Sequence, residues 1–349
     1  MPPSTPIKSF DTIQLGLAST PAVNQYLAQA EFEGIATAPL LDQLQIDSTI
    51  LHNSDRHITG NQFQQLINLL LKTSANHFFG LHSSRFVRPD SYHVLGDITM
   101  NCRTFAEVLA KIQPFEQLVG DMGVTRIQRD GQFSQIQWFC QYTEPEVIKQ
   151  MVDNCLASWL TFTRQIIGQQ HSPHQVLLRR PTPSLAAQQQ YQRCFNCTVL
   201  FNQKVDALVI KNQLLNLPVI APGGELLSTL EARAQQIIDS LSDINTVAQR
   251  VAIIVAAQLP HGLPLLEIVA QQLNISAKTL QRRLKAENTR YIVILNEVRL
   301  SQASSLLNMP GLSLIQISEW LGFGEPRSFY RWFKQLTGTS PRAFCQNQC

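Results

Sequence analysis

The sequence predicts an α+β N-terminal domain followed by an all-α C-terminal domain. The spacing of apolar residues alternates between helical and strand-like patterns over residues 23–224, and it is helical throughout residues 243–349. The charge distribution divides the chain at the same place. Residues 243–349 contain 11 Lys and Arg against 6 Asp and Glu, whereas the whole chain contains 28 against 25. The positive excess therefore lies at the C-terminal end, where we expect any contact with a polyanion.

The composition is that of an ordinary globular protein, with 44% hydrophobic and 15% charged residues. A length of 349 residues suits two domains that each bury a core. No apolar run approaches the roughly 18 residues of a membrane span, and the first residues lack the pattern of a secretory signal. The 7 cysteines show no disulfide-framework spacing. We therefore expect a cytoplasmic protein without a membrane partner.

The N-terminal segment, residues 1–22, is polar and rich in proline, and we expect it to be poorly ordered. Helical spacing follows from about residue 23 to residue 73. Its clearest apolar stripe consists of Phe63, Leu66, Ile67, Leu70 and Leu71. A further helix is predicted over residues 105–119, with Thr104 as its N-cap.

Alternating apolar and polar residues then predict two strands, at 124–129 and 133–140, joined by a turn at Asp130-Gly131. The remaining predicted elements of this domain are helices at 145–167 and 185–195 and strands at 175–179, 199–201 and 207–210. Residues 23–224 are therefore expected to form an α+β domain. An amphipathic helix is expected to link this domain, over residues 225–242, to the C-terminal domain at 243–349.

The C-terminal domain contains an internal repeat, with a first copy at 265–285 and a second at 313–334. Positions of like character are Leu266 and Leu314, Val269 and Ile317, Ala270 and Ser318, Leu273 and Leu321, and Ile275 and Phe323. After a one-residue insertion they continue with Leu280 and Phe329, Arg282 and Arg331, Leu284 and Phe333, and Lys285 and Lys334. So many matched positions indicate that both copies have the same structure.

Each copy is typical of two helices joined by a tight turn. Asn274 and Gly322 stand in the turns and tolerate the left-handed backbone conformation. Ser276 can cap the second helix of the first copy, and Pro326 suits the first turn of its counterpart. This arrangement is that of a helix-turn-helix motif, whose second helix can enter the major groove of DNA.

The outward faces of the two second helices carry the candidate DNA-binding residues. They are Lys278, Gln281, Arg282 and Lys285 in the first copy, and Arg327, Tyr330, Arg331 and Lys334 in the second. Arg and Lys suit guanine and Gln suits adenine, while the two lysines further along, Lys285 and Lys334, are expected to contact phosphates. The alternative is a pair of amphipathic helix hairpins with solvated basic faces. Two motifs in the one basic region favour DNA.

A helix predicted over residues 291–307 connects the two motifs. Its inward residues are Ile294, Leu295, Val298 and Ala303. If this connector is rigid, both second helices can enter adjacent segments of the major groove, about 34 Å apart on one face of the duplex. The first set, with Gln281, suits the reading of bases, whereas the aromatic-backed second set suits less selective reading.

This region closely resembles the AraC/XylS family of bacterial regulators. The resemblance covers about 245–345 and is carried by Ile275–Lys285, by Leu321–Lys334 and by Thr337–Arg342. One departure is Gly324, where the family often has Ser or Asp; glycine is an acceptable cap that lacks the side-chain hydrogen bond. The resemblance implies double-stranded operator or promoter DNA as a partner, and RNA polymerase if the protein is an activator. Activation and repression both remain open.

The N-terminal domain is similar to the effector domain called arabinose-binding in one subgroup of that family. The likeness spans roughly 25–210 and is carried by Leu95-Gly96, Thr104–Leu109 and Tyr191–Phe201. It implies a small-molecule effector and a homodimer, although it does not establish arabinose as the effector. The alternative is a domain that only dimerises or contacts a protein, and such a domain would lack a pocket of a few hundred Å³.

Other candidate sites are weak, and we expect neither an enzyme nor a bound metal or cofactor. The closest histidine pairs are His52 and His57, His77 and His82, and His171 and His174. None has the i, i+4 spacing of a helical metal pair. Cys194-Phe-Asn-Cys197 lacks a second pair, so it indicates packing cysteines or, less readily, a redox sensor. Arg179-Arg180 fits an anionic effector less well than a solvated strand end.

Overall fold

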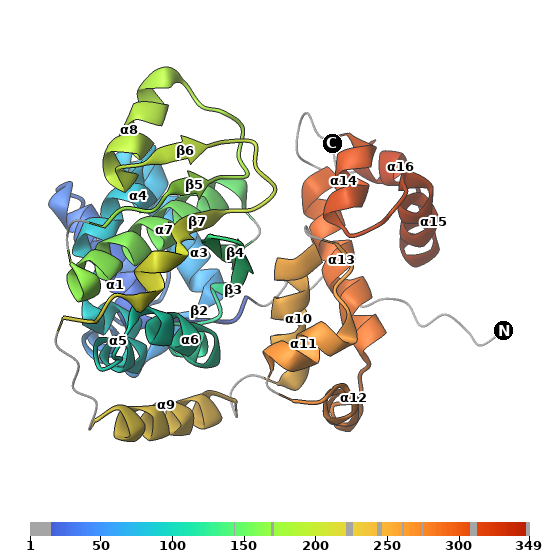
Figure 1. The fold of residues 1–349 in the computed structure, drawn as a ribbon. Coiled ribbons are helices and arrows are strands. Elements are labelled where there is room, and N and C mark those ends of the chain that lie inside the picture. Colours follow the sequence, from blue (N-terminus) through green and yellow to red (C-terminus); the bar gives the residue numbers. More distant parts are fainter. Residues whose placement is uncertain are drawn as a thin grey trace. The chain divides into compact units, whose positions relative to one another are not determined.

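The computed structural model describes residues 15–142, 144–168, 171–220, 226–242, 246–259, 262–273, 275–307 and 313–346. They form two compact units, which divide between Ile244 and Asn245 (Figure 1). Within the described ranges, none of the helices combines the length and the apolar character needed to span a bilayer.

The N-terminal unit contains both helices and strands. Its α-helices are α1 (Thr20–Phe32), α2 (Ala38–Gln43), α3 (Gly60–Ser74), α4 (Phe79–Ser83), α5 (Val94–Met100), α6 (Phe105–Phe115), α7 (Pro145–Ile167), α8 (Leu185–Phe195) and α9 (Leu227–Ser242). Short 3₁₀ helices are η1 (Ser48–His52), η2 (Ser84–Phe86), η3 (Pro89–Tyr92), η4 (Glu116–Leu118) and η5 (Asn212–Asn216). Its strands are β1 (Leu17–Ser19), β2 (His57–Thr59), β3 (Gly123–Asp130), β4 (Phe133–Cys140), β5 (Gln175–Leu177), β6 (Thr198–Leu200) and β7 (Ala207–Lys211).

The strands form two sheets. Strands β1 and β2 pair alone, and the larger sheet has the order β3-β4-β7-β5-β6 (Figure 1). All neighbours are antiparallel except β5 and β6. The β3–β4 hairpin turns at Gly131, which has a φ of 51° and lacks the Cβ that would strain this conformation. The mixture of sheet and helices confirms the predicted α+β class.

Local sequence signals account for most element boundaries. The Oγ1 of Thr59 accepts the backbone N–H of Gln62 at the start of α3, and the Oγ1 of Thr104 accepts that of Glu107 at the start of α6. Helices α7 and α8 have the predicted bounds. Strand β1 and the first residues of α1 lie within the segment 1–22, so regular structure begins earlier than the proline-rich composition indicated.

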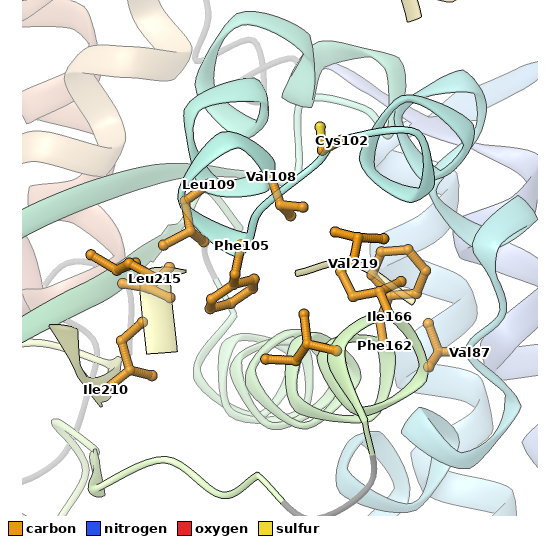
Figure 2. Close-up of a cluster of buried hydrophobic side chains, with 12 residues drawn as sticks. Val87, Cys102, Phe105, Val108, Leu109, Phe162, Ile166, Ile210, Leu215 and Val219 are labelled. Carbon is orange, nitrogen blue, oxygen red and sulfur yellow. The ribbon is translucent and has the colours of Figure 1, made fainter. Parts of the chain in front are cut away.

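The core of this unit lies between α6, α7 and the larger sheet (Figure 2). Helix α6 contacts β3, and α7 contacts β4. The buried cluster comprises Val87, Cys102, Phe105, Val108, Leu109, Ile136, Phe162, Ile166, Ile167, Ile210, Leu215 and Val219. Because these residues come from segments that are far apart in the chain, their packing holds the sheet and both helices together.

Helix α9 packs against the N-terminal unit. Ala234 and Ile238 of α9 are buried with Ile98 and Leu118. The Nζ of Lys111 on α6 lies 2.5 Å from Oε1 of Glu231 on α9. The segment expected to link the domains therefore shares a core with α5, α6 and η4.

The C-terminal unit is all helical in its described residues. Its helices are α10 (Val247–Gln258), α11 (Leu266–Gln272), α12 (Ala277–Ala286), α13 (Tyr291–Leu307), α14 (Leu314–Trp320), α15 (Pro326–Thr337) and α16 (Pro341–Gln346). Helix α13 belongs to two cores: Ile294, Leu295 and Val298 pack with α10, α11 and α12, while Leu300 and Ala303 pack with α14 and α15. One continuous helix therefore anchors both motifs.

Candidate nucleic-acid interface and a cavity in the N-terminal unit

The first candidate recognition helix is α12. It begins after Ser276, whose Oγ accepts the backbone N–H of Thr279 at 3.2 Å. Leu280 and Leu284 are fully buried in the core that α12 shares with α10, α11 and α13, which fixes the rotation of the helix. The residues on its exposed face include Lys278, Gln281, Arg282 and Lys285. This is the orientation that the sequence predicted.

The second candidate recognition helix is α15, which begins at Pro326. Its N-cap is Glu325, whose side chain makes no capping bond, so the cap is not Gly324 as expected. Gly322 in the turn has a φ of 69°, as predicted for a left-handed position, while Asn274 in the first turn lies outside the described residues. The residues on the exposed face include Arg327, Tyr330, Arg331 and Lys334.

The two helices present their polar residues in equivalent positions. In each, the buried pair is spaced i, i+4, Leu280 and Leu284 or Phe329 and Phe333. Each exposed residue has the same offset from that pair in both copies. The structure records no ion pair between these eight side chains and any carboxylate of the described residues. Their donors therefore face solvent and can meet phosphates or base edges.

The second motif is held to the connector helix α13 by a buried arginine. The Nε of Arg299 donates to the carbonyl of Leu321 at 2.9 Å, and its Nη2 donates to the carbonyl of Gly322 at 3.0 Å. Its guanidinium lies 4.2 Å from the centre of the Phe323 ring. Arg299 thus satisfies carbonyls at the end of α14 and fixes the turn before α15. Sequence reasoning missed it, although a cation in an apolar stretch was a signal.

Further bonds from α13 and α12 complete the frame. The Nε1 of Trp332 on α15 donates to Oδ1 of Asn296 at 2.9 Å, and the hydroxyl of Tyr291 donates to the carbonyl of Pro264 at 2.6 Å. After α12, the carboxylate of Glu287 accepts the first two N–H groups of α10, from Val247 at 2.7 Å and Ala248 at 2.8 Å. A carboxylate at a helix N-terminus also interacts favourably with the helix dipole.

The N-terminal unit contains a cavity of about 150 Å³. It lies between α1, α5, α6, α7 and the face of the larger sheet that carries Ile136 and Trp138. Most lining side chains are apolar. The polar side chains in the lining are Gln25, Thr99, Glu116, Thr125, Asn154, Ser158, Thr163, His171 and Ser172, with the hydroxyls of Tyr26 and Tyr92. The cavity is comparable to an engineered apolar cavity that holds benzene.

One wall of the cavity carries a buried carboxyl group, that of Glu116. Its Oε2 accepts the backbone N–H of Thr125 at 2.9 Å. Protein surrounds the side chain, yet part of its surface remains accessible, as is usual for a group that lines an internal space. Burial raises the pKa of this carboxyl to about 8, against which the hydrogen bonds from Thr125 act. The sequence held no signal for this group, because an acid after an amphipathic helix resembles a surface residue.

Other candidates from the sequence are placed in the N-terminal unit. Arg180 is not a solvated strand end: its guanidinium pairs with the buried carboxylate of Asp153 and donates to the hydroxyl of Tyr191 at 2.8 Å. It is therefore a core ion pair and no open anion site. Burial raises the pKa of both Cys194 and Cys197 to about 11, so they are thiols at neutral pH. Among the described residues, no three His, Cys, Asp or Glu side chains are grouped to hold a metal ion.

Comparisons with known proteins match both units. Residues 34–219 match the model of the arabinose-binding domain of AraC transcription regulators, N-terminal, and residues 269–347 match a helix-turn-helix domain. The regulator VirS of Mycobacterium tuberculosis is 30% identical over 156 residues, which is 44% of this chain and 45% of that protein. The ornithine utilization regulator of Pseudomonas aeruginosa is 26% identical over 176 residues, 50% of this chain and 51% of that protein.

The activator CfaD of Escherichia coli is 31% identical over 121 residues, 34% of this chain and 45% of that protein. The chain thus spans about half the length of the curated relatives it matches. The crystal structure of the transcriptional regulator CdpR from Pseudomonas aeruginosa aligns with 93% of this chain and 96% of that one, with a TM-score of 0.48 and 18% identity. Because the arabinose-binding model matches residues 34–219, more than half of the 349 residues, the chain belongs to the AraC family of transcription regulators.

Proposed function

We propose that the protein is a sequence-specific DNA-binding transcription regulator that reads two adjacent segments of the major groove. The observation that carries this proposal is the pair of helices α12 and α15, whose exposed polar faces occupy equivalent positions and share the connector α13. A helix-turn-helix places the N-terminal half of its second helix against base edges. Two such helices on one rigid connector fit two successive turns of one DNA face.

The exposed residues divide into base-reading and phosphate-binding groups by their place along each helix. Arg282 and Arg331 lie near the middle of their helices, three residues before Lys285 and Lys334, and suit the O6 and N7 of guanine. Gln281 suits adenine, whereas Tyr330 at the equivalent position offers a ring and a hydroxyl, so the second helix discriminates less. The later lysines suit phosphates, which fix the register without reading sequence.

A small-molecule effector in the N-terminal cavity is the second part of the proposal. The cavity is concave and mostly apolar, with several polar groups in its lining, which is the usual character of a small-molecule site. This character supports the sensor over a domain that only dimerises or contacts a protein. The volume of about 150 Å³ is smaller than the few hundred Å³ expected of an effector pocket, so the cavity suits a compact ligand. A homodimer, and contact with RNA polymerase in the case of activation, are further expectations of the family.

DNA binding by the full chain is tested with an operator selected from a random duplex library and measured by fluorescence anisotropy. Arg282→Ala and Arg331→Ala are each expected to cost about 1–3 kcal/mol on the selected site and to relax its sequence preference. Lys334→Ala should weaken binding to all DNA sequences evenly, and it should reduce the slope of log affinity against log salt concentration by about 1. Arg126→Ala, on the exposed edge strand β3, is the matched control. Wild-type affinity and preference in both arginine variants would show that the helices are not oriented for base contact.

Effector binding is tested by thermal unfolding of the full chain against a broad metabolite library. A ligand at 100 times its Kd adds about 2.7 kcal/mol to the stability of the folded state. Val108 lines the cavity, and the larger side chain of Val108→Phe would fill part of it. A compound that stabilises the wild-type protein should therefore no longer stabilise this variant. A response that persists in Val108→Phe would place the ligand elsewhere, and no response from wild type would favour the dimerisation alternative.

A further inference from the structure

We propose that the cavity of the N-terminal unit takes an uncharged, largely apolar ligand with one hydrogen-bond acceptor, and that the carboxyl group of Glu116 donates a hydrogen bond to this acceptor. The inference rests on the proposed effector site and names the chemistry of its ligand. It follows from three features of the cavity: the charges in its wall, the hydrogen bonding of Glu116, and the apolar rings in its lining.

The wall of the cavity offers no lysine or arginine as a counter-charge to an anion. Among the described residues that line it, Glu116 is the one acidic side chain, none is Lys or Arg, and His171 is the one histidine. An anionic ligand would therefore lose its hydration without meeting a permanent cation, and burial of an unpaired charge is strongly unfavourable. The lining therefore disfavours carboxylates, phosphates and other anions as ligands.

The hydrogen bonds of Glu116 come from Thr125, through its side chain and its backbone N–H. The Oε2 of Glu116 accepts the N–H of Thr125, and the side chain of Gln113 donates to the carbonyl of Thr125 at 3.0 Å, which holds that segment in place. Because one oxygen already accepts a backbone N–H, a proton on the carboxyl belongs on Oε1. A protonated carboxyl group can donate one hydrogen bond, so it complements a carbonyl or ether oxygen.

The protonated form is also the form that burial favours. With a pKa of about 8, most Glu116 carboxyls carry a proton at pH 7. A cationic ligand would require Glu116 to release this proton, and the ion pair would have to offset the desolvation of both charges. A neutral ligand meets neither cost. The lining rings of Phe105, Trp138 and Trp159 supply apolar surface for the rest of such a molecule.

The cysteine and the two tyrosines in the wall do not account for a change of charge between pH 6 and pH 9. Burial raises the pKa of Cys155 on α7 well above its ordinary value, and it does the same for Tyr26 on α1 and Tyr92 on η3. These groups therefore stay neutral. His171 also lines the cavity. A His171→Gln variant separates its effect from that of Glu116.

The test uses four compounds that share a phenyl body: acetophenone as the neutral acceptor, benzoate as the anion, benzylamine as the cation, and ethylbenzene without a polar group. Binding to the full chain is measured by calorimetry at pH 6, 7, 8 and 9. At pH 7 acetophenone should bind more tightly than the other three compounds. Its affinity should fall about tenfold between pH 7 and pH 9, because Glu116 loses the donated proton through a pKa of about 8.

Glu116→Gln decides whether the carboxyl is responsible. Its amide keeps an oxygen for the N–H of Thr125 and presents a permanent donor, so this variant should bind acetophenone at pH 9 as wild type does at pH 7. Glu146→Gln, an exposed acid of α7 with a side chain 72% accessible, and His171→Gln should keep the wild-type pH dependence.

The outcomes separate this inference from the proposed function. Preference for benzylamine that rises with pH and disappears in Glu116→Gln would overturn the inference in favour of a cation, and preference for benzoate would overturn it in favour of an anion. Equal affinity for ethylbenzene and acetophenone would show that Glu116 makes no bond to the ligand. In these three cases the effector cavity itself stands. Failure of all four compounds to bind wild type at any pH would count against both the inference and the cavity as a ligand site.

Discussion

Replacement of Arg299 by methionine should loosen the second helix-turn-helix motif while it leaves the first intact. The variant keeps an unbranched side chain of similar length but loses the two hydrogen bonds to the carbonyls of Leu321 and Gly322 and the contact with the ring of Phe323. Hydrogen bonds from a charged donor contribute about 1.5–3 kcal/mol each, and a cation over a ring about 0.5–2 kcal/mol. The apolar surface that methionine buries offsets about 1 kcal/mol. We therefore expect a loss of about 2.5–7 kcal/mol.

Amide hydrogen exchange of the full chain locates this loss. Protection should fall in α14 and α15 and stay at the wild-type level in α11 and α12, because the first motif has its own buried core around Leu280 and Leu284. Affinity for the selected operator should fall, with sequence preference lost in the half that the second helix reads. These two measurements together distinguish a positioning residue from one that contacts DNA.

Two matched variants control for the charge. Arg299→Lys keeps the cation without the planar fork that reaches both carbonyls, so it should lie between wild type and Arg299→Met. Arg290→Met removes an exposed arginine just before α13, and it should leave exchange in α14 and α15 unchanged. Wild-type exchange of the second motif in Arg299→Met would refute the claim that this arginine fixes the turn before α15.

Three further changes have defined outcomes. Glu287→Gln removes the negative charge at the first N–H groups of α10, so chemical denaturation should report a loss of about 1–2 kcal/mol from the C-terminal unit. Gly322→Ala places a Cβ at a φ of 69° and 3.1 Å from the backbone of Gly262, so the same assay should report about 1–2 kcal/mol; an unchanged midpoint would contradict the close approach. Glu116→Gln should gain stability over wild type as pH rises from about 4.5 to 8. Over this range the folded protein holds a proton that the unfolded chain releases, so wild-type stability falls with pH; equal slopes of stability against pH in both proteins would refute the raised pKa.

The sequence by itself determined the local structure of this protein. Alternation over residues 133–140 gave a strand, and caps such as Thr104 and Ser276 gave helix starts, because these signals depend on neighbours within a few residues. The internal repeat predicted both motifs. It also predicted how α12 and α15 are rotated about their axes, because the buried positions of an amphipathic helix determine which residues are exposed to solvent.

Only the tertiary structure decided the properties that depend on residues far apart in the chain. The order β3-β4-β7-β5-β6 joins strands separated by whole helices, and the cavity is lined from four α-helices and the sheet at once. Arg180, which the sequence left as a solvated strand end or an anion site, lies in the core because Asp153 stands opposite it. Arg299 braces a turn more than twenty residues away. Glu116 keeps its proton near neutral pH because distant segments exclude water from it, and no neighbour in the sequence reports how far a side chain is removed from solvent.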